Sequence, residues 1–134
     1  MNIDTKICGK IIIAILTMLV LFHLAILSGL LPMNIVWGGR LQDKDEMILL
    51  ELFAIFINAL IILLVSMRLG FIKNRIPPRA LQVSIWVISL MFTTNIFTNL
   101  MAYHWFEKWV MGTVTIILSF LFIRLALLTK GKKP

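Results

Sequence analysis

Cysteine is nearly absent from this chain of 134 residues, which contains only Cys8. A single cysteine excludes an intrachain disulfide, a C-x-x-C redox pair and a metal cluster held by cysteines. Charge is scarce as well: 14% of the residues are charged and 60% are hydrophobic, and the mean hydropathy is +1.00. This balance excludes a soluble domain of this length and indicates a protein of the lipid bilayer.

Two further absences narrow the fold and the chemistry. Polar and apolar residues do not alternate along the chain, which argues against a membrane β-barrel. The sequence also lacks a G-x-G-x-x-G, P-loop, H-E-x-x-H or G-x-S-x-G motif. We therefore expect no catalytic residues, no cofactor and no metal site, although acid–base chemistry by a buried carboxylate and a histidine stays open.

Four apolar runs occupy most of the chain, and each has about 20 residues, enough to cross about 30 Å of hydrocarbon as a helix. Helices satisfy their own backbone hydrogen bonds, as a lipid environment demands. We predict an all-α integral membrane protein with one domain, an up-down-up-down bundle of four transmembrane helices. The helices are expected at about 10–31, 44–68, 79–103 and 107–129.

Basic residues are divided unequally between the two ends of these helices. Ten of the 13 lysines and arginines flank the start of the first helix, the loop between the second and third, and the end of the fourth. The other three are Arg40, Lys44 and Lys108. The positive-inside rule then predicts a multi-pass protein of the plasma (inner) membrane with both termini in the cytoplasm. Such short basic clusters favour anionic lipid headgroups as partners and not nucleic acid.

The stretch from Asn34 to Asn58 contains four of the six acidic residues. Asp43 precedes Glu46 and an apolar run, a pattern typical of a capped helix start. Continuing this helix places Glu51 and Asn58 on one face, about 10 Å apart along the axis. Glu51 either reaches the headgroup region or joins a polar cluster inside the bundle. Arg40, in the preceding loop, either extends to lipid phosphates or folds back to pair with Glu51.

Other polar residues are expected at the same depth in the outer part of the membrane. His23 lies toward the outer end of the first helix, and Asn95 and Asn99 are one turn apart on the third. Each has two interpretations: a hydrogen bond that joins neighbouring helices, or a contact with a ligand or proton. The candidate pocket residues are His23, Arg40, Glu51, Asn58, Asn95 and Asn99.

Small and aromatic residues have structural interpretations. Gly112, Thr115 and Ser119 form a stripe of small side chains on the fourth helix that suits close helix packing. Trp37 and Trp109 are expected to anchor helix ends in the membrane interface.

The layout resembles the small multidrug transporters in size and number of helices. Their membrane-embedded acid in the first helix is missing, however, since that helix offers only His23. Proteins similar to the vitamin K reductases are excluded by the single cysteine.

Three classes of function follow from these features. The leading one is a binding, accessory or regulatory membrane protein with a polar pocket open to the outer side. A small transporter or ion or proton-pathway subunit is the alternative, and a membrane enzyme is the third. A closed pocket favours binding, whereas a polar path that continues past Asn58 favours transport. For each of the three classes, the partner could be a second copy of the chain or another membrane protein.

The predicted topology can be tested by cysteine labelling in a Cys8→Ser background. We expect Gln42→Cys to react with an impermeant thiol reagent in intact cells, because 42 lies in an outer loop. Asn74→Cys should react only after lysis. The reverse pattern would show that the topology is inverted.

Overall fold

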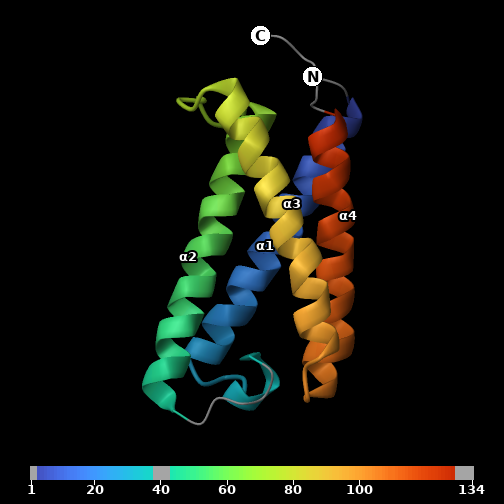
Figure 1. Ribbon diagram of the computed structural model, residues 1–134. Helices are drawn as coiled ribbons and strands as arrows, with labels where there is room; N and C mark the ends of the chain where they lie inside the picture. The colour runs from blue at the N-terminus through green and yellow to red at the C-terminus, as the bar shows by residue number, and fades with distance from the viewer. Residues whose placement is uncertain (1–2, 38–42, 129–134) are drawn as a thin grey trace.

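The structure is a computed structural model that describes residues 3–37 and 43–128, and every regular element in these ranges is helical. Its four long helices are α1 (Ile3–Leu27), α2 (Lys44–Leu69), α3 (Pro78–Leu100) and α4 (Gly112–Leu128) (Figure 1). A π-helix, η3 (Phe106–Met111), runs into α4, and a short 3-10 helix, η1 (Met33–Ile35), lies between α1 and α2. With η3 counted into α4, each is long and apolar enough to cross a membrane, which confirms the predicted number of helices of membrane-spanning length.

The helix ends follow local sequence signals. Asp43 caps α2 by accepting a hydrogen bond from the backbone N–H of Asp45 at 3.0 Å, as the sequence predicts. α1 covers 3–27 instead of the expected 10–31. Its end is set by Gly29, whose φ of 79° is a left-handed conformation that glycine adopts without steric cost. The chain then leaves the helix axis four residues earlier than its hydropathy indicates.

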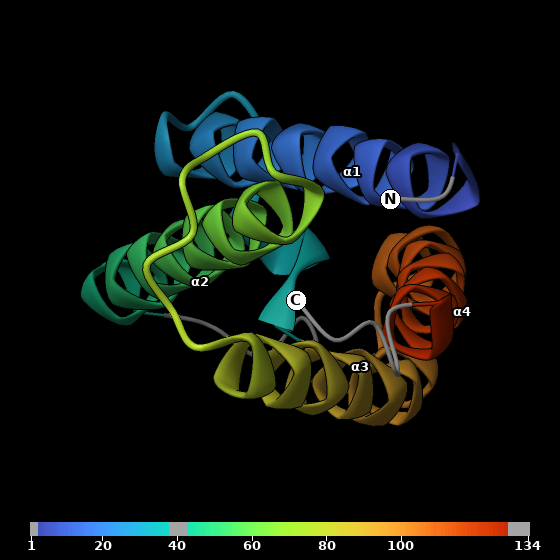
Figure 2. The ribbon, with the colours of Figure 1, turned by 90° about the horizontal axis from the view of Figure 1, so that it is seen from above.

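The helices are arranged as two hairpins. α1 packs chiefly against α2, and α3 packs chiefly against α4. α1 also packs against α4, whereas the interface between α2 and α3 is small. Figure 2 shows the four helices around a central space, which the segment containing η1 crosses. The weak α2–α3 contact therefore leaves one side of the bundle less closed than the others.

One end of the bundle is tightly packed. A Cβ atom added to Gly9 would lie 2.6 Å from the Leu69 side chain, so α1 and α2 approach closely only because this residue is glycine. Arg68 of α2 donates a hydrogen bond to the Gln82 side chain of α3 at 3.0 Å, and Gln82 donates to the Ala126 carbonyl of α4 at 2.9 Å. These contacts join all four helices near the loop 70–77.

The main core continues from this end toward the middle of the bundle. Phe92 of α3 stacks on Phe122 of α4, with ring centroids 5.3 Å apart. The core is formed by buried residues of all four helices: Cys8, Ile12, Leu16, Ile61, Val65, Leu69, Ile85, Ile88, Phe92, Leu118, Phe122, Leu125 and Ala126. Phe92 lies at the limit of this core and also lines the cavity described below.

At the other end, α2 and α3 diverge (Figure 1). The segment 28–37 folds under the opening between the hairpins instead of extending away from the bundle. Val36 of this segment packs against Ile26 and Met47 in a second, smaller cluster. The segment 28–37 is therefore part of the folded structure at this end.

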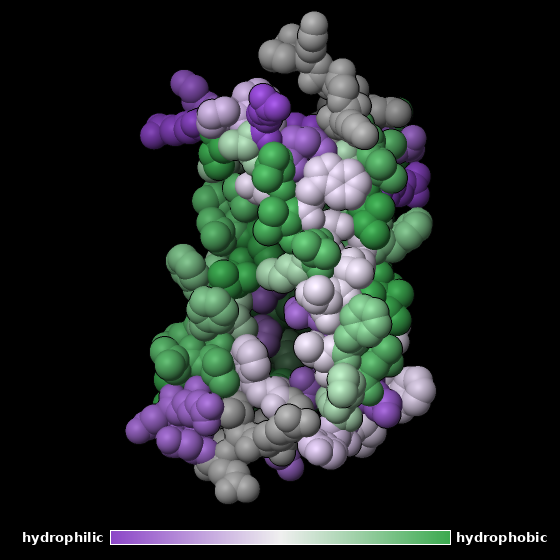
Figure 3. Space-filling view, viewed as in Figure 1, coloured by the Kyte–Doolittle hydropathy of each residue, from purple (hydrophilic) through white to green (hydrophobic). Residues whose placement is uncertain are grey.

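The outer surface of the helices is apolar. Figure 3 shows a broad hydrophobic band between more hydrophilic ends. Large side chains such as Phe53, Phe56 and Phe97 are more than half exposed. This surface is what a multi-pass membrane protein presents to lipid, where apolar exposure is favourable.

The core predicts a sharp difference between two phenylalanines of α4. Phe122→Ala should lower the free energy of unfolding by roughly 2 kcal/mol, since the residue is fully buried and its removal leaves a cavity of about 100 Å³. Phe120→Ala should change it by less than about 0.5 kcal/mol, because that side chain is 62% exposed. Reversible unfolding in mixed micelles measures both; equal losses would place Phe122 outside the core.

Candidate functional site

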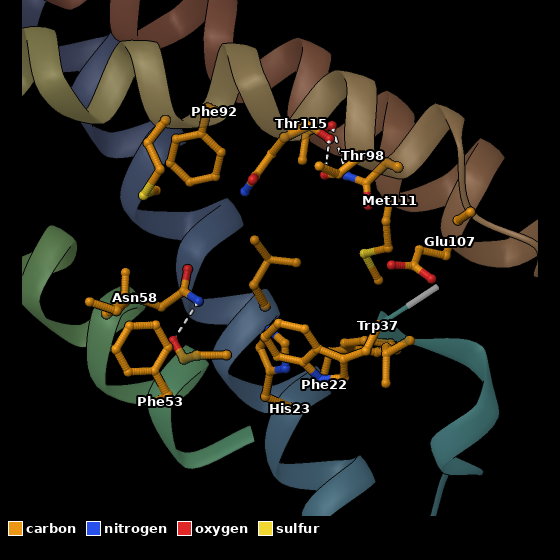
Figure 4. A pocket seen from close by; sticks show the side chains of 18 of the residues that line it. Phe22, His23, Trp37, Phe53, Asn58, Phe92, Thr98, Glu107, Met111 and Thr115 are labelled. Carbon is orange, nitrogen blue, oxygen red and sulfur yellow. Dashed lines mark hydrogen bonds between the residues drawn. The ribbon is translucent and has the colours of Figure 1, made fainter. Parts of the chain in front are cut away.

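A cavity of about 720 Å³ lies where the two hairpins diverge. Figure 3 shows a hollow in the face between α2 and α3, and Figure 4 shows the side chains that surround it. All four helices, η3 and the segment 28–37 contribute to its wall. The lining is mostly apolar and includes the polar residues His23, Trp37, Asn58, Asn95, Thr98, Asn99, Glu107 and Thr115.

Glu51 lies behind this wall and is completely buried. Its Oε2 is 2.7 Å from Nδ1 of His23 on α1, and its Oε1 accepts a hydrogen bond from Nε1 of Trp37 at 2.7 Å. A buried carboxylate is costly unless donors satisfy it, and each of its oxygens has one here. The carboxylate thus connects α2 to α1 and to the segment 28–37.

Trp37 adopts an unusual backbone conformation at this position. Its φ is 56°, which places a bulky side chain in the left-handed region. This conformation costs about 1–2 kcal/mol in a residue other than glycine and persists only where its surroundings enforce it. The bond from the indole to Glu51 is a specific contact that offsets this cost. The sequence position of Trp37 indicated a membrane anchor. In the structure its side chain is also part of the cavity wall.

His23 lines the cavity, and only one of its two ring nitrogens contacts Glu51. Nδ1 is engaged by Glu51, the ring packs edge-on against Phe22, and the side chain remains 15% exposed. Figure 4 shows His23 and Trp37 together on one side of the cavity. Because Glu51 fixes Nδ1, Nε2 is the nitrogen available to a bound molecule.

Asn58 of α2 lines the same side of the cavity, closer to the main core. It is 9% exposed, and its Nδ2 donates to the Ala54 carbonyl of its own helix at 2.8 Å. This local bond leaves the amide oxygen as an acceptor at the wall (Figure 4). The seven-residue spacing that relates Glu51 to Asn58 does bring both to the inner face of α2, where both are buried.

The opposite side is formed by α3 and α4. Asn99 donates to the Thr115 hydroxyl at 3.2 Å, and Thr115 donates to the Gly112 carbonyl at 2.9 Å. Deeper, Thr93 and Ser119 share a hydrogen bond of 2.7 Å. The predicted stripe of small residues thus faces α3 and accepts its polar side chains. Asn95 lines the cavity, and its side-chain amide makes no hydrogen bond to the residues that the structure describes.

The π-helix η3 completes the wall. It brings Glu107 and Met111 to the cavity, and its Phe106 stacks on Phe22 of α1 with ring centroids 5.6 Å apart. A π-helix is rare and occurs often at functional sites. The hydropathy of the sequence does not reveal this π-helix. Its turns are wider than those of an α-helix, so different residues face inward.

The six candidates from the sequence have different positions in the structure. Four of them line the cavity: His23, Asn58, Asn95 and Asn99. Glu51 does not line it and acts through its bonds to His23 and Trp37. Arg40 lies outside the described residues. Sequence reasoning did not select Trp37, Phe22 or Glu107 as site residues, although tryptophan beside a glycine pair was a signal for a special turn.

The Glu51 contacts make a testable prediction. Glu51→Leu should lower the free energy of unfolding by about 3 kcal/mol, because the partly buried side chains of His23 and Trp37 both lose their hydrogen-bond partner. The matched control is Glu46→Leu on the same helix, where the side chain is exposed and the change should be small. In a Trp37→Phe background the effect of Glu51→Leu should shrink, since one bond is already lost. Equal effects of the two leucine variants would contradict this assignment.

Within 3–37 and 43–128, no group of three histidine, cysteine or acidic side chains gathers as metal ligands would. No family model, no curated protein and no solved structure matches the chain. The function of the protein is therefore inferred from the cavity and the side chains around it.

Proposed function

We propose that this protein is a membrane-embedded binding protein that takes an amphipathic molecule from the lipid into the cavity between its hairpins. The observation that carries the proposal is the cavity of about 720 Å³ between α2 and α3, two helices with little mutual contact. Its size and its mostly apolar wall with a few polar groups are typical of sites for small molecules.

The same proposal includes the orientation in the membrane. The helices alternate in direction, both termini are cytoplasmic, and the membrane is the plasma membrane, because basic residues concentrate at one end of the bundle. Lys73 and Arg75 of the cytoplasmic loop, and Arg79 at the start of α3, then contact anionic headgroups. The cavity lies in the outer half of the bilayer in this orientation.

Lateral entry is supported by the side chains beside the cavity. Phe53 of α2 and Met101 after α3 line it while remaining 58% and 78% exposed. These side chains form an exposed apolar rim beside the cavity. A molecule with an apolar body can pass this rim, whereas an ion or a sugar would lose its hydration there.

Binding is favoured over transport by what lies at the inner limit of the cavity. Ile61 and Phe92 line it and belong to the dry core, and the core residue Leu16 is completely buried at the same interface. An ion-pathway subunit needs polar groups or water across this region. The polar side chains Thr93 of α3 and Ser119 of α4 are paired with each other.

Photolabelling tests the proposal with a defined probe. A monoacylglycerol with a diazirine in its acyl chain should label cavity residues of α3 in purified protein, and unlabelled monoolein should compete. Ala54→Phe should lower this labelling about tenfold, because the new ring fills the cavity and removes roughly 1.4 kcal/mol of binding. Ala59→Phe is the matched control, since Ala59 is exposed on the same helix. Labelling that neither Ala54→Phe nor monoolein reduces would reject the cavity as a binding site.

A further inference from the structure

The cavity wall contains polar atoms that make no hydrogen bond to the residues in 3–37 and 43–128. His23 uses Nδ1 for Glu51, which leaves Nε2, and Asn58 uses only Nδ2, which leaves its oxygen. The whole Asn95 amide makes no hydrogen bond to any described residue. Polar groups without partners at a membrane-embedded wall are costly unless a ligand or water meets them.

These atoms come from two facing walls. His23 and Asn58 belong to α1 and α2, whereas Asn95 belongs to α3 on the opposite side. Figure 4 shows the space between these walls, with Phe22, Phe53 and Trp37 near one and Phe92 near the other. Aromatic side chains around a gap favour a flat ring. The ligand that fits this pattern is a ring with polar atoms on opposite edges.

The charge of the wall limits the ligand further. The described residues that line the cavity include no lysine or arginine, and they include the acid Glu107. Phosphate and carboxylate groups are usually held by arginine, lysine or a helix N-terminus. A neutral polar group therefore suits this cavity better than a phospholipid headgroup does.

We propose that the ligand is a lipid-soluble quinone or quinol, with its ring between the walls of His23 and Asn95 and its tail leaving between α2 and α3. This inference rests on the proposed function and specifies its ligand class. A quinone carbonyl accepts a hydrogen bond from the Asn95 amide, and from His23 Nε2 when that nitrogen carries a proton. A quinol hydroxyl donates to the Asn58 oxygen, or to His23 Nε2 when it is unprotonated. The proposal concerns binding and includes no electron transfer.

Trp37 provides an internal probe for the test. It lines the cavity, whereas Trp86, Trp105 and Trp109 are exposed and do not line it. Replacing those three with phenylalanine in protein held in lipid nanodiscs leaves Trp37 as the only fluorophore of its kind. Decylubiquinone should quench its emission in a saturable manner. A variant with Trp86 alone should show only the linear quenching that partition into the bilayer produces.

Substitutions then locate the site. His23→Leu and Asn95→Leu should each weaken saturable quenching by about fivefold, the loss expected for one hydrogen bond. Thr94→Val is the matched control for Asn95, because Thr94 is exposed on α3 and outside the cavity wall. Ala54→Phe should abolish saturable quenching. Quenching that saturates but ignores both leucine variants would overturn the proposed placement of the ring.

Two results separate this inference from the proposed function. If monoacylglycerol labels the cavity while decylubiquinone quenches Trp37 only linearly, the quinone assignment fails and the amphipathic binding site stands. If neither probe reaches the cavity and the protein is a stable dimer, a second copy covers the opening and both proposals fail.

Discussion

The buried carboxylate of Glu51 is the interaction on which the open end of this protein depends. A carboxyl group that is completely buried needs a hydrogen-bond partner for each oxygen, and these partners are His23 on α1 and Trp37 in the segment before α2. The two bonds therefore hold three parts of the chain together. They also compensate the left-handed backbone of Trp37, which keeps the segment 28–37 folded under the cavity. Glu51 thus shapes the cavity wall without being part of it.

The cavity exists because the two ends of the bundle pack differently. At one end, Gly9 lets α1 and α2 touch, and the Arg68, Gln82 and Ala126 contacts join α2, α3 and α4. At the other end, each hairpin is held within itself: α1 to α2 by Glu51, and α3 to α4 by Asn99 and Thr115. Interhelical hydrogen bonds in membranes contribute only about 0.6 kcal/mol each on average. The separation of the hairpins consequently reflects many weak contacts within each pair and few between α2 and α3.

This division has a consequence for ligand binding. The side of α3 and α4 is a stiff wall, since Thr93 bonds to Ser119 and the Phe92 ring stacks on Phe122. α1 and α2 also pack closely against each other, but their side of the cavity includes His23 and Trp37, which are partly exposed and bond to Glu51. A molecule that contacts His23 or Trp37 acts directly on the bonds of Glu51.

The sequence by itself determined the class of protein, because four apolar runs of membrane length admit few folds in lipid. It also determined the Asp43 cap and the inward face of Glu51 and Asn58, which depend on short-range helix geometry. Only the tertiary structure decided that Glu51 lies behind the cavity, that Trp37 turns back to meet it, and that η3 brings Glu107 to the wall. These features depend on a left-handed residue and a π-helix. Both change the direction of side chains without changing hydropathy, so periodicity in the sequence could not locate them.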